Sequence, residues 1–415
     1  MQLTVYKNIG CLVGITHHRG PCCHKGTDMD ALQCIENAYL AIKGEHIFDF
    51  GCMSEYKSTM MEGCIVEEID VNHGWVFPAF CDSHTHLVYA GSRETEFEDR
   101  IKGLTYEEIA ARGGGILNSS KRLEKASEDD LYRDARKRLE EVIGKGTGAI
   151  EIKSGYGLST QSELKMLRVI KRLKSESRAL IKATFLGAHA IPEKYRNNSQ
   201  GYVDLICNEM IPEIAREQLA DYVDVFCDRG YFSPDNTRQI LDKAAEFGLK
   251  GKIHADELAL SGGTRVAVEK NCISVDHLER ITDVEIELLG GSSTIPTVLP
   301  GASFFLSMPY APARQMIDSG LPVAIASDYN PGSSPSGDMR FMASLACLKM
   351  RLTPCEAIAA TTLNGAAAIE ADKCIGSIEK GKFATFFITE PLPSMAFLLY
   401  AYSTPLIKRV VLKGK

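Results

Sequence analysis

The sequence predicts an α/β fold: a (β/α)8 TIM-like barrel with a small β-sandwich domain formed from both chain ends. Three observations support this prediction. Apolar strand-like segments alternate with helical segments through the middle of the chain, β-like segments without helices occupy both ends, and polar residues follow nearly every predicted barrel strand. The carboxyl ends of all strands meet on one face of a barrel, which would gather those polar residues into one site. An open, doubly wound sheet is the alternative arrangement.

The two chain ends have the pattern of short strands. From residue 1 to 76, apolar segments are separated by turn signals, such as Lys43-Gly44-Glu45-His46. From about residue 376 the β pattern returns, in 376–388 and 407–412. We expect these strands to pair with the amino-terminal ones, so that 1–76 and 376–415 form a discontinuous small β domain around a barrel domain at 77–375.

The middle of the chain contains eight apolar segments that we predict to be barrel strands. They are 76–81, 148–152, 180–186, 222–226, 251–254, 274–277, 294–299 and 322–327. The connections between them hold helical patterns at 127–143, 160–173, 212–217, 234–247, 263–270 and 311–317. Eight strands with mostly helical connections are the number that a (β/α)8 barrel requires.

Composition excludes several classes of protein. Hydrophobic residues at 45% and charged residues at 24% of 415 are typical of a globular chain. The net charge of −7 gives no reason to expect nucleic acid or an anionic membrane as a partner. A run of about 18 uncharged apolar residues is absent, as is a signal-peptide pattern, so we expect a cytoplasmic protein. The 13 cysteines lack regular spacing and are expected to be reduced thiols.

The strongest chemical signal is a His-x-His pair, His84 and His86, after the first barrel strand. Residues i and i+2 of a strand point to the same side, as two ligands of one metal ion would. His254 and Asp328 follow the fifth and eighth predicted strands. Three imidazole nitrogens and one carboxylate suit one divalent metal ion, Zn²⁺ or Fe²⁺, and leave room for a water.

The same strand ends indicate how many ions bind and what they do. The fourth strand ends in Asp224-Val225-Phe226-Cys227-Asp228, without the lysine or glutamate that would bridge a second ion, so we predict one. An ion here would lower the pKa of its water towards about 7 and supply a hydroxide nucleophile. Glu257 is the candidate general base and then acid. His277 either stabilises the oxyanion or only positions neighbouring side chains without taking part in catalysis.

Further polar residues at these strand ends suit a small anionic substrate. Arg93 could hold a carboxylate through two hydrogen bonds. Tyr156, His189, Asn330, Gly332 and Ser333 add hydrogen-bonding groups.

Two other polar segments are interpreted as loops. The Cys/His cluster at 17–24 lacks the spacing of a tetrahedral structural metal site. Arg112-Gly113-Gly114-Gly115 lacks the Gly-Lys-Ser/Thr of a phosphate loop, so we interpret it as a flexible loop near the mouth of the site.

The motifs at 77–86, 111–116, 151–158, 186–189, 223–228, 254–258 and 327–333 together resemble the imidazolonepropionase family of the amidohydrolase superfamily. His-x-His and the late aspartate mark the superfamily, whereas Lys-Ser-Gly-Tyr-Gly from Lys153 and Asp-Tyr-Asn-Pro-Gly-Ser from Asp328 mark the subfamily. The similarity covers essentially the whole barrel. The first 75 residues are the divergent part.

The resemblance implies hydrolysis of 4-imidazolone-5-propanoate to N-formimidoyl-L-glutamate, in histidine degradation. It also implies a homodimer. It assigns the metal ligands to His84, His86, His254 and Asp328, substrate contacts to Arg93, Tyr156, His189, Glu257 and Ser333, and product contacts to Asn330 and Gly332. The alternative is a mononuclear amidohydrolase that deaminates a nitrogen heterocycle, for which Arg93 has no obvious use. A relative without activity that serves as a scaffold would usually lack metal ligands, and here all of them are present.

Overall fold

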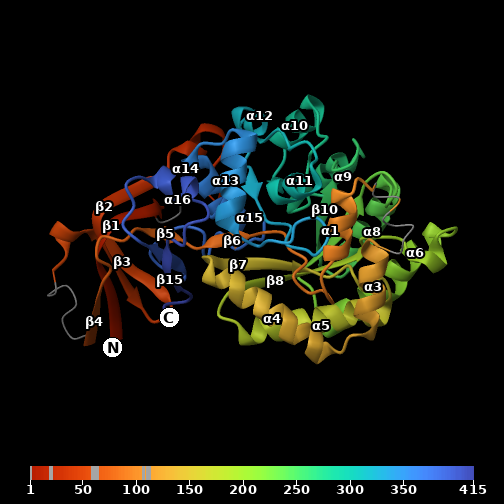
Figure 1. The fold of residues 1–415 in the computed structure, drawn as a ribbon, viewed down its shortest axis with the longest axis horizontal. Coiled ribbons are helices and arrows are strands. Elements are labelled where there is room, and N and C mark those ends of the chain that lie inside the picture. Colours follow the sequence, from red (N-terminus) through yellow and green to blue (C-terminus); the bar gives the residue numbers. More distant parts are fainter. Residues whose placement is uncertain (1, 18–21, 58–64, 105–107, 109–113) are drawn as a thin grey trace.

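A computed structural model gives the structure of residues 2–17, 22–57, 65–104, 108 and 114–415. Two sheets organise the chain. Figure 1 shows a small sheet on the left, beside which both termini lie, and a larger strand-and-helix unit on the right.

The larger sheet has eight strands in the order β13-β12-β11-β10-β9-β8-β7-β6, and all of its neighbouring strands are parallel. The strands are β6 (Phe80–Asp82), β7 (Thr147–Lys153), β8 (Leu180–Ala188), β9 (Tyr222–Cys227), β10 (Lys250–Ala255), β11 (Ser274–His277), β12 (Ile295–Val298) and β13 (Ala324–Ile325). Beyond β6 and β13, the amide of His86 donates to the Tyr329 carbonyl at 2.9 Å, and the amide of Asp328 donates to the His84 carbonyl at 3.0 Å. These bonds close the sheet into a barrel at its carboxyl end, which confirms the predicted fold.

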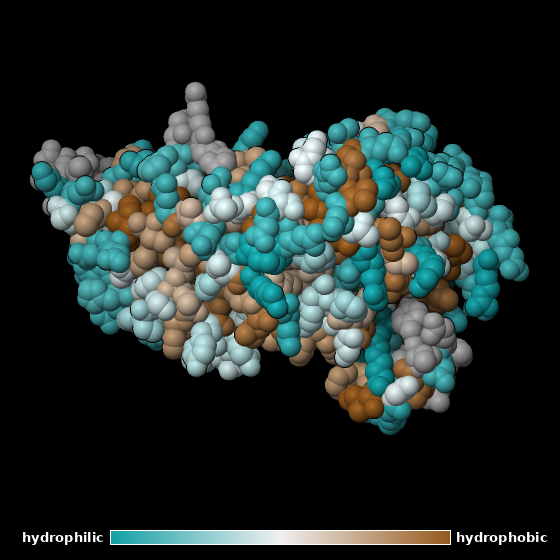
Figure 2. Space-filling view, turned by 90° about the horizontal axis from the view of Figure 1, so that it is seen from above, coloured by the Kyte–Doolittle hydropathy of each residue, from teal (hydrophilic) through white to brown (hydrophobic). Residues whose placement is uncertain are grey.

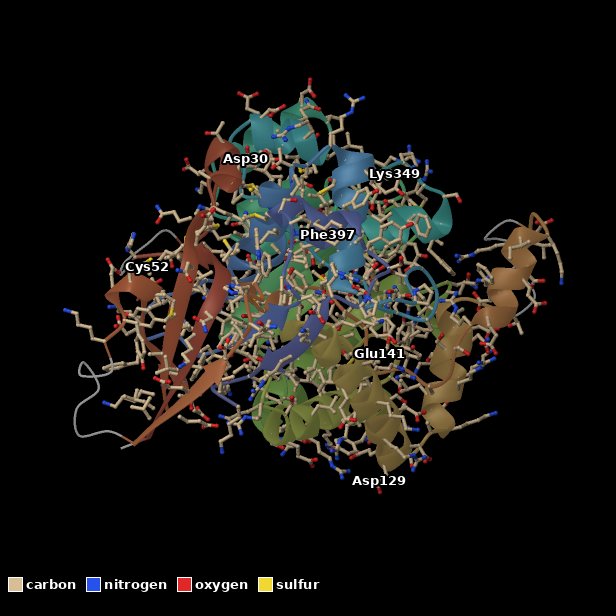
Figure 3. All side chains as sticks on the ribbon, turned by 60° about the vertical axis from the view of Figure 1, so that its left-hand side comes forward. Asp30, Cys52, Asp129, Glu141, Lys349 and Phe397 are labelled. Atoms are coloured by element: carbon tan, nitrogen blue, oxygen red, sulfur yellow. The ribbon has the colours of Figure 1, made fainter. Side chains whose placement is uncertain are left out.

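Helices connect the strands. They are α1 (Glu94–Ile101), α3 (Ile116–Lys125), α4 (Glu128–Gly144), α5 (Thr160–Glu176), α6 (Ser199–Leu205), α7 (Ile211–Glu217), α8 (Pro234–Glu246), α9 (Gly263–Glu269), α10 (Asp283–Gly290), α11 (Pro300–Leu306), α12 (Ala313–Asp318), α13 (Met339–Met350), α14 (Pro354–Thr361), α15 (Leu363–Ala367) and α16 (Met395–Tyr400). Several begin where the sequence provides a cap: the hydroxyls of Ser127, Ser159 and Ser233 accept from the third residue of α4, α5 and α8. In Figure 3, Asp129 and Glu141 mark the two ends of α4.

The small sheet is mixed and draws strands from both chain ends. Its strands are β1 (Gln2–Ile15), β2 (Gln33–Lys43), β3 (His46–Cys52), β4 (Ile65–Asp70), β5 (Val76–Pro78), β14 (Phe386–Thr389) and β15 (Ile407–Val411). Their order is β15-β14-β5-β1-β2-β3, and β4 pairs with β1. The carboxyl-terminal strands therefore join the amino-terminal ones through β5, as the sequence predicted.

One boundary differs from the prediction. The segment 76–81 was expected to form a single barrel strand, but Val76–Pro78 pairs with β14 and β1, and only Phe80–Asp82 joins the barrel. The Ala79 amide donates to Thr385 and the Phe80 amide donates to Gly146, so the chain changes sheets here. A continuous apolar pattern does not reveal such a change because both halves are buried. We propose that 1–76 with 376–415 form the small β domain and 77–375 the barrel domain; this boundary falls within β5, whose strand pairing lies in the small sheet.

Surface features agree with the composition. Figure 2 shows a mostly hydrophilic face with scattered hydrophobic patches. Among the described residues, no helix is long and apolar enough to cross a membrane. The cysteines within the described residues are all free thiols.

Phe387 joins the two sheets. Its ring centroid lies 5.3 Å from that of Phe77 in the small sheet and 4.9 Å from that of Phe80 in the barrel, and the side chain is fully buried. Truncation of a buried phenylalanine to alanine leaves a cavity in the core. We therefore expect Phe387→Ala to lower the free energy of unfolding by about 3–5 kcal/mol. Denaturant titration measures this, with Phe48→Ala as control, since Phe48 is 44% exposed. Equal losses in both variants would contradict the assigned role.

Candidate active site

A cavity of about 720 Å³ opens at the carboxyl ends of the barrel strands. Its walls include His86, Arg93, Tyr156, His189, His254, Glu257, His277, Asp328, Asn330, Gly332 and Ser333. Every residue that the sequence singled out for chemistry lines this cavity except His84, which is fully buried beside it. The barrel thus brings together segments that lie far apart in the sequence.

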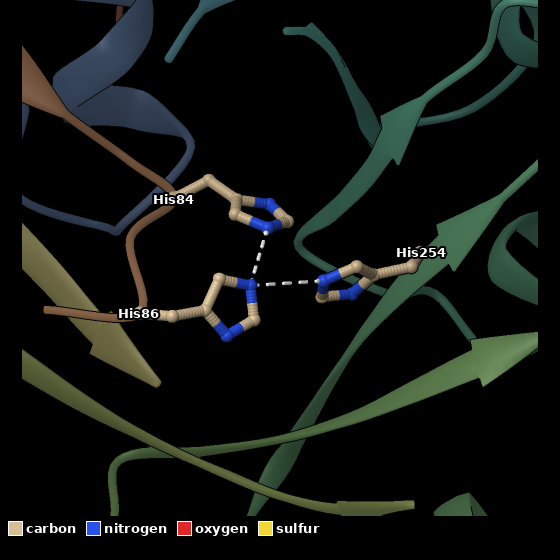
Figure 4. Close-up of side chains that lie close together, drawn as sticks. All are labelled: His84, His86 and His254. Carbon is tan, nitrogen blue, oxygen red and sulfur yellow. Dashed lines mark hydrogen bonds between the residues drawn. The ribbon is translucent and has the colours of Figure 1, made fainter. Parts of the chain in front are cut away.

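Four candidate ligand atoms converge at the floor of the cavity. His86 Nε2 lies 3.3 Å from His84 Nε2 and 3.5 Å from His254 Nε2, as Figure 4 shows. Asp328 Oδ1 lies 3.5 Å from His84 Nε2 and 3.4 Å from His86 Nε2. Ligands about 2.0–2.1 Å from a tetrahedral zinc ion are separated by about 3.3–3.4 Å, so this donor set fits one such ion.

Two histidines of this cluster, His84 and His254, are held neutral. Burial lowers the pKa of His84 well below its ordinary value, and the Lys153 charge acts in the same direction. Burial also lowers the pKa of His254 to about 4, although Asp224 opposes the shift. Neutral imidazoles present a lone pair, which is the form that binds a metal ion.

Two carboxylates orient the rings of His84 and His254. Asp276 Oδ2 lies 2.7 Å from His84 Nδ1, and Asp224 Oδ2 lies 3.0 Å from His254 Nδ1. A proton held on Nδ1 by a carboxylate leaves Nε2 free to act as the ligand. His86 is oriented differently: its ring stacks on that of His189, with centroids 5.1 Å apart.

The loop after β13 fixes the carboxylate of Asp328. Asp328 has a φ of 53°, in the left-handed region, and Ser333 Oγ donates to its Oδ2 at 2.9 Å. Asn330 Oδ1 accepts from the amides of Gly332 and Ser333 at 2.7 and 2.8 Å. These bonds leave Asp328 Oδ1 directed towards the histidines.

Glu257 and His277 form a second group on the cavity wall. His277 Nδ1 lies 3.7 Å from one carboxylate oxygen of Glu257 and 3.7 Å from one of Glu279. Burial raises the pKa of Glu257 to about 7. Burial opposes the charge on His277, but Glu257 and Glu279 together raise its pKa to about 10. Near neutral pH this pair therefore combines a carboxyl group at its titration point with a protonated imidazole.

Buried carboxylates also hold the loops that carry two of the predicted residues. Glu163 accepts from the amides of Gly155 and Gly157, at 3.1 and 2.7 Å, and so fixes the loop around Tyr156. Asp228 Oδ2 accepts from the amide of Glu257 at 2.8 Å. A carboxylate on α5 and one that directly follows β9 therefore hold these two loops.

Arg93 lies in the cavity wall but already has a carboxylate neighbour. Its guanidinium pairs with Glu96, and both side chains are buried. A Cβ atom at Gly332 would lie 2.0 Å from Arg93 Nη1, so a side chain at this position would displace the guanidinium. Arg100 Nη1 donates to the Gly332 carbonyl at 3.1 Å.

His189 and Tyr156 complete this wall. His189 Nδ1 lies 3.1 Å from the Gly155 carbonyl and therefore carries the proton, which leaves Nε2 as an acceptor. The two ring centroids are 5.5 Å apart.

Sequence reasoning missed three further arginines of the cavity, Arg100, Arg229 and Arg280. Arg229 and Arg280 each follow a predicted strand end within a few residues, which was the available signal. Residues 112 and 113 of the predicted loop Arg112-Gly113-Gly114-Gly115 lie outside the described residues. In the Cys/His segment, residues 18–21 are not described, and the amide of His24 donates to Asn364 Oδ1 at 2.8 Å.

Comparison with known proteins places the chain among hydrolases. The Amidohydrolase family pattern matches residues 75–415. An imidazolonepropionase of Christiangramia forsetii is 52% identical over 390 residues, which cover 94% of each chain. An imidazolonepropionase of Alkaliphilus oremlandii is 40% identical over 417 residues, which cover 100% of this chain and 98% of the relative.

Solved structures share the fold at low identity. A triazine hydrolase variant superposes with a TM-score of 0.76 at 15% identity, covering 99% of this chain and 94% of that one. The guanine deaminase of E. coli superposes with a TM-score of 0.70 at 16% identity, covering 99% and 98%. These likenesses confirm the barrel and its accompanying sheet.

Proposed function

Because the chain belongs to the amidohydrolase family, and within it to the imidazolonepropionases, we propose that its cavity hydrolyses 4-imidazolone-5-propanoate to N-formimidoyl-L-glutamate, a step of histidine degradation. The identity of 52% over 94% of both chains carries this conclusion. The converging donors and the arginine-lined cavity support it.

The proposed metal ligands are His84, His86, His254 and Asp328, and the ion is Zn²⁺ or Fe²⁺, since both accept imidazole and carboxylate ligands. The spacing of 3.3–3.5 Å between neighbouring donor atoms supports this set. A bound divalent ion would polarise the ring carbonyl and lower the pKa of a water molecule.

Glu257 is the proposed proton carrier. Its carboxylate accepts the proton of the water whose oxygen bonds to the ring carbonyl carbon, and it then gives that proton to the ring nitrogen as the C–N bond breaks. The protonated His277 beside it donates to the oxyanion that develops on the carbonyl oxygen. Water is thereby added across the cyclic amide, which yields one new carboxylate.

Arg93 is the proposed partner of the propionate carboxylate. Tyr156, His189 and Ser333 contact the substrate, and Asn330 and Gly332 contact the product. The product carries one carboxylate more than the substrate, and the arginines that line the cavity match this gain of negative charge.

We further propose a homodimer located in the cytoplasm. The free thiols of the described cysteines support a reducing compartment. Sedimentation equilibrium of the purified chain tests the dimer, and fractionation of source cells tests the location.

The activity itself is the first prediction. Purified, metal-loaded protein incubated with 4-imidazolone-5-propanoate should yield N-formimidoyl-L-glutamate, detected by mass spectrometry, without release of ammonia. Ammonia release from a nitrogen heterocycle, with no turnover of the imidazolone, would favour the deaminase alternative instead.

The metal content of two variants distinguishes the proposed ligand His254 from His277, which is assigned to the oxyanion. We expect one Zn²⁺ per wild-type chain by elemental analysis and a large loss in His254→Ala, because this ring supplies a proposed ligand. His277→Ala is the matched control: its ring is equally buried, yet it is assigned to the oxyanion, so the ion should remain. Retained metal in His254→Ala, together with loss in His277→Ala, would overturn the assignment.

The pH dependence of kcat/KM tests Glu257. The base works as a carboxylate, and its pKa is raised to about 7, so the ionised fraction falls as the pH drops below 7. We expect kcat/KM to decline about tenfold per pH unit below that point. Glu257→Gln should lose about 10²–10⁴-fold in kcat at pH 8. A wild-type profile that stays flat from pH 5.5 to 8 would remove Glu257 as the base.

The carboxylate clamp is tested by Arg93→Ala. We expect its KM for 4-imidazolone-5-propanoate to rise about tenfold or more, with a smaller change in kcat. Gly332→Ala should act in the same way, because the added Cβ would lie 2.0 Å from Arg93 Nη1. Gly290→Ala serves as control, since the added Cβ would lie 3.9 Å from the Leu321 side chain, at ordinary contact distance. An unchanged KM in Arg93→Ala would disprove the clamp.

A further inference from the structure

A cluster of five buried charges lies beneath the candidate metal ligands. Three carboxylates, Glu151, Asp224 and Asp276, surround two ammonium groups, Lys153 and Lys252, and all five side chains are fully buried. These residues come from strands β7, β9, β10 and β11. The proposed reaction uses none of them directly. Buried charges of this kind are retained only where they are paired.

Lys153 occupies a special place in this cluster. Its Nζ donates to Glu151 Oε1 at 2.7 Å and to Asp224 Oδ2 at 2.8 Å, and it lies 3.7 Å from Asp276 Oδ2. Asp224 Oδ2 and Asp276 Oδ2 are the same oxygens that approach the Nδ1 atoms of His254 and His84. One ammonium group therefore contacts both carboxylates that orient two of the histidines.

The charge on Lys153 is secured by its surroundings. Burial opposes it, but Asp224, Glu151 and Asp276 raise the pKa of Lys153 above its ordinary value. A fixed cation between two buried carboxylates offsets their mutual repulsion and restricts where each oxygen can lie.

We propose that Lys153 is a positioning residue, which fixes Asp224 and Asp276 so that His254 and His84 both direct Nε2 towards one ion. This inference rests on the proposed metal site. It assigns a role to the lysine of the Lys-Ser-Gly-Tyr-Gly motif, which takes no part in the proposed reaction. Residues that hold a metal-ligating histidine through its second nitrogen commonly change metal affinity about 10–100-fold when they are altered.

Lys252 provides a matched control. It belongs to the same cluster and is equally buried, but its Nζ pairs with Glu151 and donates to the Ser83 carbonyl at 3.0 Å and the Ala368 carbonyl at 3.3 Å. Loss of either ammonium removes one buried positive charge. Only the loss of Lys153 removes the direct contact with both histidine-orienting carboxylates.

The experiment compares wild type, Lys153→Met and Lys252→Met as full-length chains loaded with Co²⁺, whose visible absorption reports the geometry of its ligands. We expect Lys153→Met to shift and weaken the cobalt band and to raise the dissociation constant for Zn²⁺ at least tenfold, measured by competition with a chelator. Lys252→Met should keep the wild-type cobalt band. Lys153→Gln, which removes the positive charge but keeps a side-chain N–H donor, is the substitute should the methionine variant not fold, and a smaller band shift in the same direction is expected.

Either of two results in the variants would overturn the inference: a wild-type cobalt band with unchanged Zn²⁺ affinity in the Lys153 variants, or equal changes in the Lys153 and Lys252 variants. A wild-type chain that does not bind Co²⁺ at all would also overturn it. Neither readout needs turnover. A chain that binds cobalt and responds to Lys153 substitution, but does not hydrolyse 4-imidazolone-5-propanoate, therefore contradicts the proposed reaction and not the role of Lys153.

Discussion

Three imidazole nitrogens and one carboxylate oxygen converge within 3.3–3.5 Å of their neighbours in a buried space. Lone pairs brought so close repel one another unless a cation lies among them, and burial keeps the His84 and His254 rings from taking up a second proton. Much of the surrounding structure serves this arrangement. The carboxylates of Asp224 and Asp276 hold the second nitrogens of two rings, and Ser333 holds the second oxygen of Asp328.

The barrel makes this convergence possible because its strands end on one face. Hydrogen bonds between the segments that follow β6 and β13 close the barrel, and these segments carry His86 and Asp328. The same bonds that complete the fold therefore set the distance between proposed ligands. His277 and Asp328 both have left-handed backbone conformations, at φ values of 85° and 53°, which turn their side chains into the cavity.

Much of this could be predicted from the sequence. The alternation of strands and helices indicated the barrel. The positions of His84, His86, His254 and Asp328 after strands indicated one site, because the carboxyl ends of all barrel strands lie on one face. The change of sheet at Ala79 was not predictable, since the residues on both sides are apolar and buried. The pairing of Arg93 with Glu96 and the contacts of Lys153 also escaped prediction. They depend on side chains that meet only after folding, and no periodic pattern encodes them.

The central claim is that these four residues hold a single ion at the floor of the cavity. A crystal structure of the zinc-loaded chain, with anomalous diffraction measured on both sides of the zinc absorption edge, tests it most directly. The account predicts one anomalous peak per chain, about 2.0–2.2 Å from the Nε2 atoms of His84, His86 and His254 and from Asp328 Oδ1. A second strong peak in the cavity, or one peak bound through His277 in place of His254, would contradict it.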